Sequence, residues 1–288
     1  MYKLTLKVSL LASLLSYHTD RFFPAQNFSP MRTICLFGLV ILSLAEPVFG
    51  QVAEEKKRGV IATVQSQTTG TDYLDTLDVS AIVISPDIGQ YFRRDEAFSE
   101  NHNPYDRFIS DSAIARGRRF YQANHELLTT AEDRFGPPAE VFVAILHVES
   151  VFGHNTETHQ VLGVLVSMIY YLDTAGWKYD PSAQLAVLPK VARAVGVNPV
   201  ELRGSYAGAV GIPQFVPTSF QQFGVDGNGD GRVDLSDMAD AIYSVGNYLK
   251  AAGWSKSSRK ALRAYNDSQL YVDCILAYAD KLKHHNSR

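Results

Sequence analysis

Apolar residues recur with helical spacing along most of the chain from Tyr105 onward. One helical stretch opens at Ser110 and ends at Gly136, and the next begins with Pro137 and Pro138 and runs into Glu149. Further helices are expected at His159–Leu172, Ser182–Val195, Leu235–Ala252 and Arg259–Lys283. A single β-like run covers residues 79–85. The pattern predicts a mainly α fold.

The run VAILHVES, residues 143–150, is apolar almost throughout and then carries a carboxylate. Glu149 lies on one helical stripe with Ile145 and Phe142. An apolar wall raises the pKa of a carboxyl group, as a general acid in glycoside cleavage requires. The alternative is a surface Glu at a helix end, although a negative charge there opposes the helix dipole. The helix by itself leaves both interpretations open.

The segment RGSYAGAVGIPQFVPTSF, residues 203–220, is rich in glycine, alanine and proline. Small residues allow close approach to the backbone, so this segment is a candidate wall of a binding groove. Ser205, Tyr206 and Gln214 then offer hydrogen-bonding groups. A tight crossing of two helices would use the same small residues, and the composition favours neither interpretation.

The run DGNGDGRVDLSD, residues 226–237, has the spacing of an EF-hand calcium loop. Gly231 supplies the turn at position six, and the expected ligands are Asp226, Asn228, Asp230, the Arg232 carbonyl, Asp234 and, at position twelve, Asp237. Asp in place of the usual Glu at position twelve makes bidentate binding harder. The alternative is an acidic turn without a metal. With no second loop in the sequence, a structural Ca²⁺ is expected rather than a sensor.

Composition narrows the classes of function. A net charge of −3 gives no basic footprint for nucleic acid. There is no Walker loop, no H-E-x-x-H zinc motif and no order of Ser, His and Asp typical of a triad. Near the C-terminus, Tyr265 and Asn266 precede a helix that Asp267 or Ser268 could cap. From spacing alone they are a packing tyrosine and a cap.

The first fifty residues resemble a leader region. Met31 to Gln51 has a positive start, a short apolar run and small residues near its end, which predicts a secretory signal cleaved near Gly50. We therefore expect Met31 to be the true start, with an uncleaved membrane anchor as the alternative. Cys35 lies too early in the apolar run for lipid attachment, which leaves Cys274 as the sole cysteine of the mature chain. Residues 51–104 are expected to form a partly irregular extension, and residues 105–288 the main domain.

Taken in order, four motifs resemble the membrane-bound lytic transglycosylase B family of peptidoglycan-cleaving enzymes. They are RFGPPAEVFVAILHVESVFG, then LRGSYAGAVGIPQFVPTSF, then the loop that starts at Asp226, and then RAYNDSQLYV. The resemblance implies a lysozyme-like, mainly helical catalytic domain with an embedded EF-hand-type calcium loop. It also implies an enzyme that acts on peptidoglycan glycan strands, with other cell-wall enzymes as further partners, and the predicted secretory signal makes the periplasm its expected location.

The resemblance also implies roles for individual residues. Glu149 is the lone catalytic acid and base, and it forms a 1,6-anhydro ring on N-acetylmuramic acid in place of hydrolysis. The substrate-contacting positions of the family correspond here to Ser205, Gln214, Phe215, Tyr248, Tyr265 and Asn266. The chain departs from the family after the catalytic helix, where an arginine pair is missing and Lys178 is the cation nearby. A lysozyme-type hydrolase and a non-catalytic peptidoglycan-binding protein are the alternatives.

Overall fold

The structure is a computed structural model of the chain, and it describes residues 54–92, 103–155, 158–174, 177 and 179–286. The predicted leader, residues 1–50, lies outside the described residues, as do parts of the predicted extension and Lys178. The chain divides into two units after Ala53, and the description below concerns the second unit.

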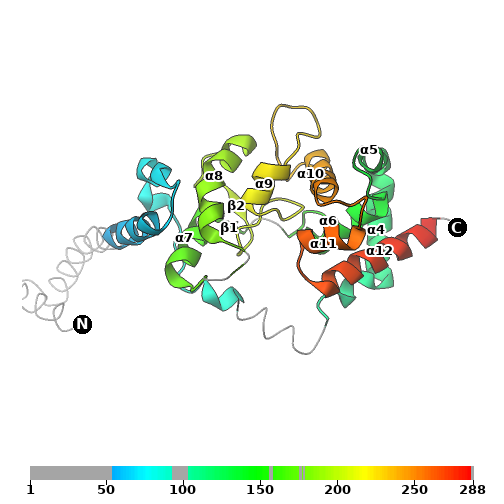
Figure 1. The fold of residues 1–288 in the computed structure, drawn as a ribbon, viewed down its shortest axis with the longest axis horizontal. Coiled ribbons are helices and arrows are strands. Elements are labelled where there is room, and N and C mark those ends of the chain that lie inside the picture. Colours follow the sequence, from blue (N-terminus) through cyan, green and yellow to red (C-terminus); the bar gives the residue numbers. More distant parts are fainter. Residues whose placement is uncertain (1–53, 93–102, 156–157, 175–176, 178, 287–288) are drawn as a thin grey trace, which may run out of the picture. The chain divides into compact units, whose positions relative to one another are not determined.

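Helices make up most of the described chain, as predicted (Figure 1). The α-helices are α4 (Asp111–Ala123), α5 (His125–Phe135), α6 (Ala139–Ser150), α7 (Val161–Tyr171), α8 (Pro181–Val195), α9 (Pro217–Phe223), α10 (Met238–Ala251), α11 (Ser258–Tyr265) and α12 (Gln269–Asn286). Short 3₁₀ helices are η1 (Asp72–Thr76), η2 (Val79–Ala81) and η3 (Asp106–Ile109), and residues 54–67 form a further helix. Strands β1 (His159–Gln160) and β2 (Arg203–Gly204) pair antiparallel.

Four sequence predictions about these elements were wrong in detail. The helix expected from His159 begins only at Val161, because His159 and Gln160 pair with β2 as strand β1. The stretch from Ser110 to Gly136 is two helices, because the chain leaves the helical region at Asn124, whose side-chain amide donates to the Phe120 carbonyl. The stretch Arg259–Lys283 is interrupted after Tyr265, where Ser268 Oγ accepts from the backbone of the first turn of α12. The β-like run at residues 79–85 contains η2 instead of a strand, since Asp78 caps this turn.

Other local predictions are confirmed. Ser110 caps α4 by accepting from the Ala113 backbone, and Gly136 ends α5 with a φ of 99°, which glycine adopts without a Cβ clash. Helix α6 is apolar nearly all round and lies inside the larger hydrophobic core, where it packs against α4, α5, α10 and α12. Its burial fixes the position of the helix end that carries Glu149.

The described part of the predicted extension, residues 54–92, is an integral part of a second hydrophobic core. Val60, Val64 and Ile82 are buried there together with residues of α7 and α8. The Gln160 side chain, also buried, accepts from the Val83 backbone and donates to the carbonyls of Ala81 and Val200. The extension therefore supports the same strands that lead into residues 203–220. No helix in the described residues is long and apolar enough to span a bilayer.

Candidate active site

Glu149 occupies the last turn of α6, where the chain turns away sharply. Val151 and Phe152 both have positive φ, 52° and 60°, which non-glycine residues rarely adopt. The turn is held because Ser150 Oγ donates to the Ile212 carbonyl at 2.7 Å and accepts from the Gly153 backbone at 2.9 Å. Strained backbone of this kind persists where the surrounding structure fixes it, and it is concentrated at functional sites.

The Glu149 carboxyl group is held in a low-polarity environment. Burial raises its pKa from 4.5 to about 7, and a hydrogen bond from Tyr271 opposes that rise by stabilising the charged form. Tyr271 Oη donates to Glu149 Oε1 at 2.7 Å, and the tyrosine itself is 1% exposed. Within the described residues, no second Asp or Glu acts on this pKa. Glu149 is thus a single acid that keeps its proton close to neutral pH.

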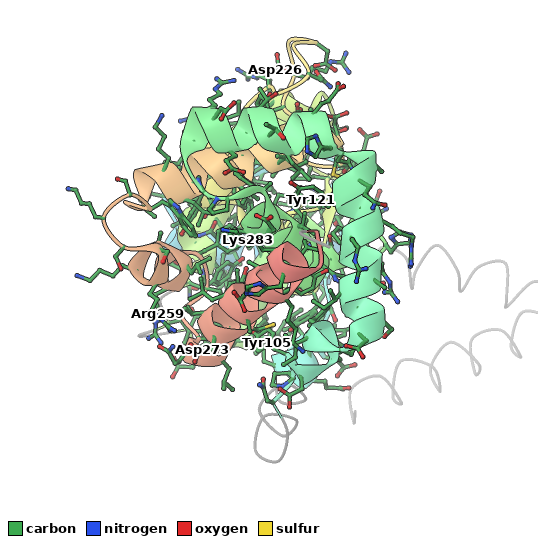
Figure 2. All side chains as sticks on the ribbon, turned by 90° about the vertical axis from the view of Figure 1, so that its right-hand side faces the viewer. Tyr105, Tyr121, Asp226, Arg259, Asp273 and Lys283 are labelled. Carbon is green, nitrogen blue, oxygen red and sulfur yellow. The ribbon has the colours of Figure 1, made fainter. Side chains whose placement is uncertain are left out.

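Tyrosines surround this carboxyl group. The Tyr105 ring meets the Tyr271 ring edge-on at 5.7 Å, and the Tyr265 ring is stacked parallel to Tyr271 at 6.3 Å. Burial and the nearby Glu149 charge raise the pKa of all three phenols, so they stay neutral hydrogen-bond donors. Figure 2 shows Tyr105 beside α12, the helix that carries Tyr271. A neutral phenol therefore orients the Glu149 carboxyl group through a hydrogen bond, and none of the three tyrosines adds a charge to the site.

The small-residue segment runs from β2 into α9 and contacts the end of α6 through the Ile212 carbonyl, and two predicted substrate residues lie on it. Ser205 Oγ accepts from the backbones of Ala207 and Ala209, which leaves its hydroxyl hydrogen outside these bonds. Gln214 has a φ of 52°, and its side-chain amide donates to the Gly211 carbonyl at 2.8 Å. A left-handed conformation costs a non-glycine residue about 1–2 kcal/mol, so the surrounding structure must impose it.

Three of the remaining predicted substrate residues form one aromatic cluster. Tyr248 and Tyr265 meet edge-on at 4.9 Å, and Tyr265 Oη donates to the Pro213 carbonyl at 2.6 Å. Asn266 follows Tyr265 at the end of α11, partly exposed. Phe215 is only 2% exposed, with its ring against both tyrosines. Direct contact of the Phe215 ring with a ligand does not fit this burial, and its ring supports the two tyrosines instead.

The predicted calcium loop has a network of side chains that fold back on its own backbone. Asp226 accepts from the backbones of Gly229 and Gly231, Asn228 from that of Asp230, and Asp230 from that of Arg232. Gly229 and Gly231 have φ of 81° and 87°, and a Cβ at either position would meet no atom within 4 Å, so the loop is open to solvent on that side. Figures 1 and 2 both show the loop projecting beyond the neighbouring helices, and Figure 2 labels Asp226 there.

Two carboxylates accept backbone hydrogen bonds at the closing end of this loop. Asp237 is the N-cap of α10, where its carboxylate accepts from the backbones of Ala239 and Asp240. Asp240 instead lies under the loop, 1% exposed, and accepts from the backbones of Gly227, Asn228 and Asp234. In the described part of the chain, no three His, Cys, Asp or Glu side chains converge closely enough to hold a metal ion.

Comparison with protein families identifies one match over most of the chain. The family described as the transglycosylase SLT domain matches residues 51–273. Membrane-bound lytic murein transglycosylase B of Escherichia coli strain K12 is 34% identical over 158 residues, which cover 55% of this chain and 43% of that protein. This chain thus spans less than half the length of that relative.

Two solved structures of lytic transglycosylases have a fold similar to that of this chain. The lytic transglycosylase Slt35 of Escherichia coli, in complex with calcium, has a TM-score of 0.66 at 20% identity and covers 81% of this chain and 94% of its own. SltB3 of Pseudomonas aeruginosa, in complex with NAG-anhNAM-pentapeptide, has a TM-score of 0.60 at 19% identity, with coverage of 81% and 79%. The prediction of a mainly helical, lysozyme-like fold is confirmed at this level.

Proposed function

The chain belongs to the transglycosylase SLT domain family, and from this premise we propose that it is a lytic transglycosylase acting on peptidoglycan. The bond cleaved is the β-1,4 linkage between N-acetylmuramic acid and N-acetylglucosamine. The observation that carries the proposal is the environment of Glu149. Its carboxyl group has a raised pKa and accepts a hydrogen bond from the Tyr271 hydroxyl, and no other carboxylate of the described chain acts on its pKa.

Glu149 serves first as the general acid. Its proton moves to the glycosidic oxygen as the bond from that oxygen to the muramyl C1 breaks, and the N-acetylglucosamine side leaves as an alcohol. A pKa of about 7 supports this step, since about half of the Glu149 carboxyl groups still carry the proton at neutral pH, whereas an ordinary Glu carries almost none. The hydrogen bond from Tyr271 then stabilises the carboxylate that results.

Glu149 serves second as the general base. The carboxylate takes the proton of the muramyl C6 hydroxyl, whose oxygen bonds to C1 and closes the 1,6-anhydro ring. This step returns the proton to Glu149, so the enzyme ends the cycle in the protonation state in which it began. The substrate's own acetamide group stabilises the positive charge at C1, which removes the need for the second carboxylate that most glycosidases use.

For substrate binding we propose Ser205 and Gln214 as partners of the acetamido sugars. The Ser205 hydroxyl keeps its hydrogen for a ligand, and Gln214 is fixed by its left-handed backbone. Tyr248, Tyr265 and Asn266 extend this surface, and Phe215 holds the two tyrosine rings in place.

We also propose that the loop at residues 226–237 holds a structural Ca²⁺. Asp226, Asn228, Asp230, the Arg232 carbonyl and Asp234 fit the first nine positions in residue type, and their side-chain-to-backbone bonds curve the loop; the three carboxylates do not converge in this structure and would have to turn toward the ion. Asp237 caps α10, so the closing position fits less well, and a modest affinity follows. The ion would brace the loop and take no part in the chemistry.

Digestion of purified sacculi tests the proposed function. The protein is expected to release muropeptides that end in 1,6-anhydro-N-acetylmuramic acid, and Glu149→Gln to release none. Products with free reducing ends would show a lysozyme-type hydrolase, and binding to sacculi without any release would show a non-catalytic protein. The predicted secretory leader makes the periplasm the proposed location, which mass spectrometry of the mature N-terminus checks.

A further inference from the structure

A second group of aromatic rings lies beside the Ser205 end of the small-residue segment. We define the aromatic platform as Tyr91, Phe92, Trp177 and Tyr206. Tyr91 is stacked on Tyr206, with centroids 5.6 Å apart and an angle of 21° between the planes. Phe92 meets Tyr206 edge-on at 5.8 Å, and its ring lies 5.4 Å from that of Trp177, tilted by 56°. Three segments far apart in the sequence thus contribute to one set of rings.

The platform packs against a small core and keeps part of each ring accessible. Tyr91 and Phe92 pack against a small core of Ile88, Val164 and Met168. None of the four rings is fully buried, and Trp177 is 38% exposed. Rings of a hydrophobic core are fully buried, whereas these four keep part of their surface accessible to solvent, and a ligand can contact that part.

The platform is continuous with the candidate active site through the backbone. Tyr206 directly follows Ser205, and Tyr179 Oη, close to Trp177 in sequence, donates to the Ala207 carbonyl at 2.8 Å. From there the segment runs to Ile212, whose carbonyl accepts from Ser150, the neighbour of Glu149. A polymer that lies along this segment from Glu149 past Ser205 therefore reaches the platform.

The chemistry of the platform selects neutral sugar rings. Arginine pairs recognise carboxylates and phosphates through paired charged hydrogen bonds. Aromatic rings instead offer a large, rigid apolar face with little loss of conformational entropy, which matches the C–H face of a pyranose. In the region after the catalytic helix, where an arginine pair was expected from the family resemblance, this chain has Trp177 on the platform.

We propose that the aromatic platform is a remote glycan subsite, which binds N-acetylhexosamine rings of the strand several sugars from the bond that Glu149 cleaves. The identity of the strand rests on the proposed function, whereas the binding of sugar rings does not. The subsite favours long strands over short fragments, because only long strands reach the platform while they occupy the active site.

The chain contains two tryptophans, which makes the platform directly observable. Trp254→Phe leaves Trp177 as the only tryptophan, and Glu149→Gln in the same chain prevents turnover. Titration with the hexamer of N-acetylglucosamine is expected to shift the Trp177 fluorescence emission to shorter wavelength. The dimer, compared at the same fraction of protein bound as measured by calorimetry, is expected to change the emission little. Tyr206→Ala is expected to weaken hexamer binding about fivefold, since an aromatic contact contributes about 1 kcal/mol.

Tyr170→Ala is the matched control, because Tyr170 is 42% exposed and has its ring contact with Tyr171, outside the platform. It is expected to bind the hexamer as the parent does. Unchanged Trp177 emission with hexamer bound, no hexamer binding at all, or equal affinity in Tyr206→Ala with an unchanged Tm would each overturn the platform. Sacculus cleavage is scored separately: cleavage without a Trp177 response leaves the proposed function standing, and a Trp177 response without cleavage leaves the platform standing.

Discussion

Tyr271 donates a 2.7 Å hydrogen bond to Oε1 of Glu149 across 122 positions of sequence. Helix α12 packs against α6, and this contact brings a buried phenol to the one carboxyl group of the site. Burial raises the pKa of Glu149 and Tyr271 lowers it, so the resulting value of about 7 depends on both. The acid strength of Glu149 is therefore set by its environment and not by a second charge.

Tyr271→Phe keeps the ring and its stacking on Tyr265 but removes the hydroxyl. Because the lost hydrogen bond stabilised the carboxylate, the pKa of Glu149 is expected to rise further. The alkaline limb of the pH profile for kcat/KM should move to higher pH, while the maximal rate falls because the base formed in the first step is less stable. A proportional loss at every pH, with no displacement of the limb, would contradict this positioning role.

Glu149→Gln is expected to stabilise the fold at alkaline pH. The folded pKa of about 7 exceeds the ordinary value of 4.5, so between these values the unfolded chain loses its proton first and stability falls as pH rises. The neutral amide of Gln does not ionise, so the variant does not lose this stability. Its gain in the free energy of unfolding has an upper limit of about 3 kcal/mol at about pH 8. Below about pH 4 the gain should vanish.

Chemical denaturation at several pH values measures that difference. Glu126→Gln, at an exposed position on α5, is the matched control for the loss of one charge. A stabilisation of Glu149→Gln that is the same at about pH 4 and about pH 8 would contradict a raised folded pKa.

Gly211→Ala is expected to be far more damaging than Gly253→Ala. Both glycines have positive φ, +70° and +86°, which costs an alanine about 1–2 kcal/mol. At Gly211 the added methyl would also lie 2.3 Å from the Leu235 Cβ and 2.6 Å from its carbonyl oxygen, whereas at Gly253 it meets nothing within 4 Å. Overpacking adds about 1–3 kcal/mol at Gly211, and urea unfolding should resolve the two variants.

Calcium is expected to raise the Tm of the parent chain through the loop at residues 226–237. A ligand that binds only the folded state stabilises it in proportion to the logarithm of its concentration over Kd. Asp226→Asn and Asp230→Asn should remove most of this rise, whereas Asp273→Asn should keep it. Asp273 is an exposed carboxylate paired with Arg259, away from the loop (Figure 2). No shift at millimolar Ca²⁺ would remove the calcium proposal.

The sequence predicts the helices better than the contacts between them. The apolar run before Glu149 predicts a buried helix, and α6 is that helix. Tyr271 could not be found from spacing, because its hydrogen bond depends on how α12 packs against α6. Asp240 escapes sequence reasoning for a different reason. It lies three residues beyond the twelve-residue calcium pattern, and only burial distinguishes it from a surface carboxylate of a helix.

The extension shows the same limit. Its polar, irregular sequence has no helical period over residues 68–92, so its order could not be predicted. It is placed by contacts that are remote in sequence, such as the bonds of Gln160 and the hydroxyl of Ser167, which accepts from the Ser85 backbone at 2.8 Å. Partners this distant follow from the assembled core and not from local pattern.

Cleavage of peptidoglycan in water labelled with heavy oxygen tests the central claim most directly. If Glu149 directs the C6 hydroxyl onto C1, the muramyl products lack one water relative to reducing-end products and carry no label. Mass spectrometry should show this unlabelled anhydro product for the parent chain and none for Glu149→Gln. Muramyl products with one labelled oxygen at C1 would show that water attacks, and would contradict the account.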